Sequence, residues 1–87
     1  MENEAIMFRA LGNGIRLNIL MAIHEQSGNW INVGEIQQIT GYTQATVSQH
    51  LSKLRDSKTV ETQREGTKVY YRISEPMVKR VLSNIKK

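Results

Sequence analysis

The segment from Thr43 to Arg55, TQATVSQHLSKLR, holds the side chains whose types and spacing best suit recognition chemistry. Laid out at about 100° per residue, Val47, Leu51 and Leu54 share one side of a helix, and small uncharged residues occupy the opposite side. In the major groove of DNA, glutamine can bond an adenine edge through two hydrogen bonds, serine can donate or accept, and an alanine methyl can touch a thymine methyl. We therefore predict a helix that reads DNA, with base-facing Gln44, Ala45, Ser48 and Gln49, flanking Thr43 and Thr46, and phosphate-facing Lys53 and Arg55.

A second group of polar residues lies around the glycine of TQREGTKVYYRI. Arg64, Thr67 and Lys68 stand at or beside the tip of an expected hairpin, where they would reach phosphates or an adjacent minor groove. Val69 and Tyr71 fall on one face of the second strand and Tyr70 on the other. Any one of these polar residues would also fit an ordinary solvated surface; a whole uncharged helix face followed by a basic hairpin favours DNA.

Composition points to a polyanionic partner. The 87 residues are 39% hydrophobic and 23% charged, which indicates one globular domain over residues 1–87. Residues 1–42 hold two Lys/Arg against four Asp/Glu, whereas residues 43–87 hold ten against four. A basic half on a small domain favours nucleic acid. The chain has no cysteine, no run long enough to span a bilayer and no leader pattern, so we expect a cytoplasmic protein without a membrane contact.

The elements that must position these side chains follow from periodicity and capping residues. We expect helices over about 3–11, 14–26, 33–40 and 44–57, capped where Asn13, Asn32 with Glu35, and Thr43 stand. Strands on either side of Gly66 form a hairpin over 59–73, and a last helix begins near Pro76. Inward-facing residues are expected at Ile15, Ile19, Ala22, Ile23, Ile36 and Ile39. The fold class is mainly α with a β-hairpin wing, in the order α-α-α-α-β-β-α: a winged helix-turn-helix.

The first and last helices carry apolar stripes that suit a homodimer. A chain this small gains stability by burying such stripes against a copy of itself. The predicted interface residues are Ile6, Phe8, Met77, Val81, Leu82 and Ile85. Two recognition helices would then lie one turn of DNA, ~34 Å, apart on a palindromic site.

These motifs resemble the ArsR/SmtB family of winged-helix repressors. FRALGNGIRLNIL is similar to the family's opening, VGEI to the start of its third helix, and the segment from TQATVSQHLSKLRD to VYYRI to its recognition helix and wing. The resemblance implies a homodimer that represses transcription from an inverted-repeat operator. It also places Gln44, Ala45, Ser48 and Gln49 at the base-facing positions.

The chain departs from the family members that sense metals or oxidants. The third helix, VGEIQQIT, has no cysteine, and the last helix, EPMVKRVLSNIKK, has neither Asp nor His. We expect His24 to be a solvated or capping residue and His50 to pack under the recognition helix. Two histidines without carboxylate or cysteine neighbours are a poor site for Zn²⁺. We predict no metal site and no cofactor. The sequence leaves open an effector or a protein partner of unknown identity.

Two other classes of function fit the sequence less well. A winged-helix protein-interaction module acting on other transcription machinery would use Trp30, in SGNWIN, as an anchor, whereas packing of Trp30 over the third helix is the simpler interpretation. An enzyme is disfavoured, because no nucleophile has a histidine and an orienting acid at a recognisable spacing, and Gly12 and Gly14 are turn residues without a phosphate-loop context.

Overall fold

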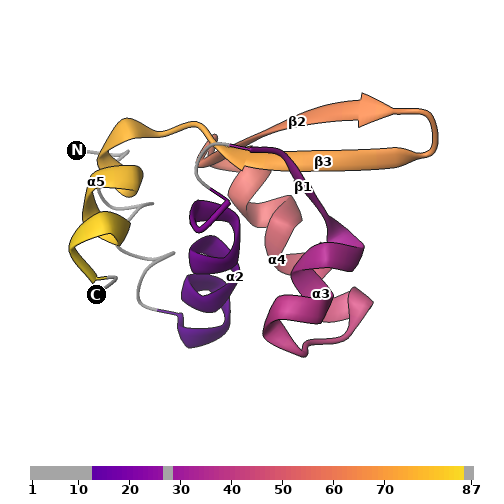
Figure 1. Cartoon of the computed structure of the whole chain (residues 1–87), viewed down its shortest axis with the longest axis horizontal. Helices are drawn as coiled ribbons and strands as arrows, with labels where there is room; N and C mark the ends of the chain where they lie inside the picture. The colour runs from indigo at the N-terminus through magenta and orange to yellow at the C-terminus, as the bar shows by residue number, and fades with distance from the viewer. Residues whose placement is uncertain (1–12, 27–28, 86–87) are drawn as a thin grey trace.

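The computed structural model describes residues 13–26 and 29–85. The helix predicted over residues 3–11, with Ile6 and Phe8, lies outside them. Within the described residues the elements run α2 (Gly14–His24), β1 (Ile31–Asn32), α3 (Val33–Thr40), α4 (Gln44–Asp56), β2 (Val60–Glu65), β3 (Lys68–Ile73) and α5 (Pro76–Ile85). Figure 1 shows α5 beside α2 at one end of the molecule, with the hairpin β2–β3 extending toward the other end above α4 and α3.

The helix starts follow the capping residues predicted from the sequence. The Asn13 side chain accepts the backbone N–H of Arg16 at the start of α2. Asn32 and Glu35 form a complete capping box at α3, each side chain bonding the other's backbone N–H at 2.9 Å. Such caps satisfy backbone donors that have no partner inside the helix, so each one fixes where its helix begins. The second helix ends at His24, two residues before the predicted end.

The sheet has one strand more than the sequence predicted. Its order is β1-β3-β2, all antiparallel, with Ile31 opposite Tyr71 and Asn32 opposite Tyr70. The hairpin register runs from Val60 opposite Ile73 to Glu65 opposite Lys68, around Gly66 at φ 65°. A two-residue strand is too short to show an alternating pattern, so only its pairing with β3 reveals it.

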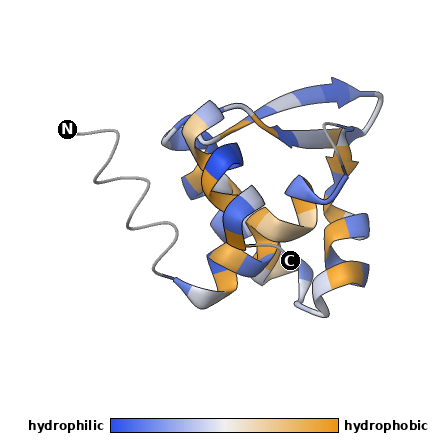
Figure 2. Ribbon diagram, turned by 60° about the vertical axis from the view of Figure 1, so that its left-hand side comes forward, coloured by the Kyte–Doolittle hydropathy of each residue, from blue (hydrophilic) through white to orange (hydrophobic). Residues whose placement is uncertain are grey.

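One apolar core joins the helices to the base of the sheet. Its buried members are Ile19, Leu20, Ile23, Ile31, Ile36, Val47, Leu51, Leu54, Val60, Ile73, Val78 and Leu82. Figure 2 shows the hairpin as largely hydrophilic and the hydrophobic residues gathered in the helices and the sheet base. The core therefore positions α4 from behind and leaves its other face to solvent.

Two residues predicted to face inward are exposed, and one residue predicted at the dimer interface is buried. Ile39 is 50% exposed because it lies at the rim of the α2–α3 contact, beside Met21 and Glu25. Ile15 is 38% exposed, one residue after α2 begins. Leu82, predicted at the dimer interface, has no exposed surface: with Val78, one turn earlier, it packs α5 into the core of its own protomer.

Candidate nucleic-acid interface

The fourth helix separates its two faces as the periodicity predicted. Val47, Leu51 and Leu54 are at most 1% exposed and anchor α4 in the core. Most predicted contact residues are exposed: Thr43, Gln44, Ala45, Gln49, Lys53 and Arg55. Ser48 and Thr46 are half-buried at the edges of that face. The helix thus presents a continuous, mostly uncharged surface over its first turns and cations further along.

The threonines at the start of α4 serve the helix itself. Thr43 Oγ1 accepts the backbone N–H of Thr46 at 3.2 Å, and the two hydroxyl groups lie 3.0 Å apart in a hydrogen bond donated by Thr43. A capping threonine of this kind stabilises a helix by about 1 kcal/mol. The first role of Thr43 in the folded chain is therefore to begin the helix.

A tight turn sets the angle between α3 and α4. Gly41 ends α3 in the left-handed conformation, with φ 81°, and its N–H donates to the carbonyl oxygen of Gln37 at 2.7 Å. The next residue, Tyr42, accepts a hydrogen bond from the Asn18 side chain at 2.8 Å, which ties the turn to α2. The arrangement is a helix-turn-helix held at both its turn and its core face.

The wing and the start of α4 border the same cleft. A depression of about 340 Å³ is lined by Asn32, Val33, Gly34, Gln44, Thr67, Lys68, Val69 and Tyr71. The structure thus brings Gln44 together with Thr67 and Lys68, two elements away in the sequence. Arg64, opposite Val69 in the hairpin, is exposed but does not line this cleft.

The charges on this side of the molecule are mostly available to a partner. In the described part of the chain, ion pairs join Arg72 to Glu61 at 2.7 Å and Arg55 to Asp56 at 3.9 Å. The second pair is long and solvent-exposed, so it contributes little. Lys53, Arg64 and Lys68 form no ion pair with the described residues.

His50 contacts a residue that the sequence did not single out. The Nε–H of Arg16, in the first turn of α2, donates to His50 Nδ1 at 3.2 Å. Burial lowers the pKa of His50, and the positive charges of Arg16 and Lys53 lower it further. Predicted packing under the recognition helix describes only part of this environment, because helical spacing within α4 gives no sign of a partner 34 residues away.

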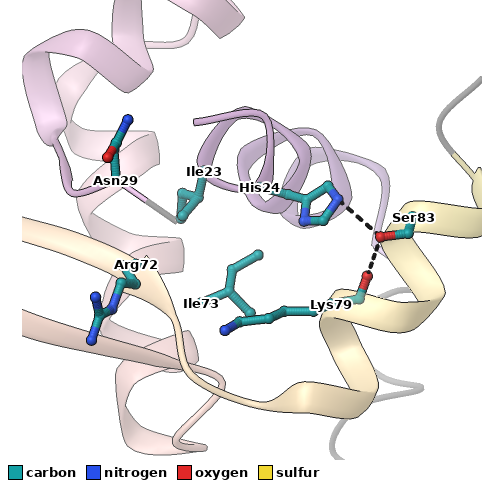
Figure 3. A pocket seen from close by; sticks show the side chains of 7 residues that line it. All are labelled: Ile23, His24, Asn29, Arg72, Ile73, Lys79 and Ser83. Carbon is teal, nitrogen blue, oxygen red and sulfur yellow. Dashed lines mark hydrogen bonds between the residues drawn. The ribbon is translucent and has the colours of Figure 1, made fainter. Parts of the chain in front are cut away.

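His24 lies far from this interface, on a separate cleft. A depression of about 350 Å³ between α2, β3 and α5 is lined by Ile23, His24, Asn29, Arg72, Ile73, Lys79 and Ser83 (Figure 3). Ser83 Oγ donates to the carbonyl oxygen of Lys79 at 2.9 Å and lies 3.4 Å from His24 Nε2. The His24 ring therefore links the end of α2 to α5.

Neither histidine has the surroundings of a metal ligand in the part of the chain that is described. No three His, Cys, Asp or Glu side chains among residues 13–26 and 29–85 gather where they could share an ion. Over the same residues, no helix has the length and apolar character needed to cross a membrane.

Trp30 is engaged within the protein. The Arg72 guanidinium lies 4.4 Å from the centroid of its ring, an attractive cation–π geometry, and the indole is half-buried. Arg72 also pairs with Glu61, so its guanidinium links Trp30 to Glu61 at the base of the wing. Trp30 thus has a contact with β3 that the sequence did not predict.

The helix-turn-helix, the three-stranded sheet with its basic hairpin, and the polar face of α4 define a winged helix-turn-helix DNA-binding domain. The family model described as "Bacterial regulatory protein, arsR family" matches residues 13–62. The chain belongs to this family of transcription regulators, as the resemblance of its motifs predicted. The family is one of regulators rather than enzymes.

Three relatives illustrate this similarity. The chain is 33% identical over 82 residues to the transcriptional repressor PagR of Bacillus anthracis, covering 94% of this chain and 80% of that protein. It is 32% identical over 77 residues to the transcriptional activator HlyU of Vibrio cholerae, covering 88% and 68%. Among solved structures, the homodimeric winged helix-turn-helix domain Mb0332 of Mycobacterium bovis superposes with a TM-score of 0.81 at 34% identity, covering 98% of this chain and 76% of that one.

Proposed function

We propose that this protein is a homodimeric repressor that binds an inverted-repeat operator through α4 and the wing β2–β3. The observation that carries the proposal is the two-sided character of α4: one side is buried to at least 99%, and the other is exposed and uncharged at its start. A helix with small polar residues facing outward fits the width and the hydrogen-bonding pattern of the major groove.

The residues divide by the part of DNA that their chemistry suits. Gln44, Ala45, Ser48 and Gln49 face the bases. Lys53 and Arg55 on α4, with Arg64, Thr67 and Lys68 on the wing, face phosphates. Base contacts specify sequence and phosphate contacts supply affinity and register, so the two groups have separable effects.

The dimer places two such units on one DNA. Met77 and Ile85 are 41% and 48% exposed, and Val81 between them is half-buried, which leaves an apolar stripe on α5 facing away from the core. The Mb0332 domain is homodimeric, which supports a dimer for this chain as well. Repression in the cytoplasm is the proposed outcome, since PagR is a repressor and a dimer bound at a promoter blocks access to it.

Selection of bound duplexes from random DNA tests the proposal. We expect an inverted repeat with half-sites about one helical turn apart. Gln49→Ala should relax the selected sequence, whereas Lys68→Ala should weaken binding to selected and random duplexes alike. Enrichment of no sequence, or of one asymmetric half-site bound by a monomer, would contradict the proposal.

A further inference from the structure

Arg16 occupies the junction between α2 and the recognition helix. It lies in the first turn of α2, which the Asn13 cap fixes, and its Nε–H donates to Nδ1 of His50 in the middle of α4. Because Nδ1 accepts this bond, the neutral His50 ring carries its proton on Nε2. Arg16 is half-buried, so its side chain reaches the surface beside α4 and does not end in the core.

The direction of this junction relative to DNA follows from helix geometry. Taking the direction opposite the buried Val47, Leu51 and Leu54 as that of the groove floor, Lys53 lies about 50° and His50 about 110° around the α4 axis on the same side. An α-helix with its side chains is about 10–12 Å wide and the major groove about 12 Å, so the sides of a recognition helix face the sugar–phosphate walls. The Arg16–His50 contact therefore faces one wall. Gln44, which lines a cleft with Thr67 and Lys68 of the wing, lies on the opposite side of α4.

The charges at the junction are positive. The groups that act on His50 are Arg16 from α2 and Lys53 from α4 itself, both cations. Among the described residues, Arg16 forms no ion pair, and its four remaining guanidinium N–H groups donate to none of them. A planar guanidinium with free donors is well suited to a phosphate, which it can bind through two parallel hydrogen bonds.

We propose that Arg16 binds a DNA phosphate on the α2 side of the groove and that His50 is the positioning residue that aims its guanidinium there. This inference rests on the proposed DNA-binding function and adds a contact outside both the recognition helix and the wing. Each half-site would then be held at both walls: by Arg16 and Lys53 on one, and by Lys68 of the wing on the other.

Two measurements with Arg16→Gln test the contact on the selected duplex and on a random one. The slope of log K against log salt should become shallower by about 0.9 for each phosphate lost, or about 1.8 for the dimer. Single neutral methylphosphonates are then placed along one half-site. One position should weaken wild-type binding and leave Arg16→Gln unaffected. Lys79→Gln, an equal loss of charge at an exposed site on α5, should keep the wild-type slope and the wild-type sensitivities.

His50 variants test the positioning role. His50→Asn keeps an acceptor at nearly the place of Nδ1, and His50→Leu removes it. The leucine variant should lose sensitivity at the Arg16 phosphate, and the asparagine variant should retain it, a pattern that a general effect on folding would not give. Circular dichroism of each free variant checks the fold, and the leucine variant carries the test if Arg16→Gln does not fold.

The outcomes separate the two proposals. A wild-type protein that binds neither duplex overturns both. Wild-type binding to an inverted repeat, with an unchanged slope and unchanged sensitivities in folded Arg16→Gln, overturns the Arg16 contact alone. Equal sensitivities in His50→Leu and His50→Asn overturn the positioning role.

Discussion

The turn between α3 and α4 allows a test of backbone strain without any change in packing. Gly41 has φ 81°, and a Cβ built there would meet no atom within 4 Å. Gly41→Ala therefore adds a methyl group to open space and changes only the cost of the left-handed conformation. Because Gly41 lies in the turn between α3 and α4, this strain would fall on the helix-turn-helix.

The magnitude follows from the conformation. A left-handed backbone costs a residue with a Cβ roughly 1–2 kcal/mol. For a domain of this length, each 1 kcal/mol lowers the Tm by about 4–8 °C. Gly41→Asn should lose less stability than Gly41→Ala, because asparagine adopts the left-handed conformation more readily than alanine does.

Gly14→Ala is the matched control. Gly14 begins α2 with an ordinary φ, and a Cβ there also meets nothing within 4 Å. Alanine in a helix is favoured over glycine by about 0.5–1 kcal/mol, so this variant should be as stable as the wild type or more so. The two substitutions are chemically identical and differ only in backbone conformation.

Urea denaturation of all four proteins at one fixed concentration measures the effect, because the stability of a dimer depends on concentration. DNA binding should weaken in Gly41→Ala if the strained turn shifts α4 against α3. A Gly41→Ala protein as stable as the wild type would refute the strain argument. Equal losses in the alanine and asparagine variants would show that φ is not the cause.

Three further outcomes are expected. The pKa of His50 in the folded chain lies below its usual 6.5, so the unfolded chain takes up this proton first as the pH falls. The free energy of unfolding should therefore fall below about pH 6.5, and it should fall less in His50→Asn. Urea titrations at several pH values measure both. Leu82→Ala should cost about 2–5 kcal/mol of stability, because Leu82 is fully buried. Met77 is 41% exposed, so Met77→Ser should mainly shift the monomer–dimer equilibrium, which sedimentation measures. Asn32→Ala should cost about 1 kcal/mol and Asn32→Ser much less, since serine can still cap α3; equal losses would argue against the capping role.

Local signals in the sequence were sufficient for most of the fold. The recognition helix, its buried stripe and its cap were predictable because a 3.6-residue period and a threonine before it are properties of consecutive residues. The hairpin was predictable from Gly66 and the alternation around it. The family motifs concentrate in these same segments, which explains why the fold class was correct.

The features that the sequence did not reveal all depend on contacts between distant segments. Strand β1 exists because Ile31 and Asn32 meet β3, some 40 residues later. The periodicity of α5 marks an apolar side but not the boundary between protomer core and outer stripe, so Leu82 was placed at the interface. The Arg16–His50 hydrogen bond likewise joins two helices whose separate patterns give no indication of each other.

Strand β3 connects the wing, α5 and the start of the helix-turn-helix. At one end it carries Lys68 of the wing, and at the other it leads through Ser74 and Glu75 into α5. Along its edge, Tyr70 lies opposite Asn32, whose side chain caps α3, the first helix of the helix-turn-helix. Ser74 also bonds the backbone of Lys58 and Thr59, just after α4. Strand β3 therefore contacts these elements in three ways: it continues covalently into α5, it pairs with β1 at the start of α3, and Ser74 at its end bonds the segment that follows α4.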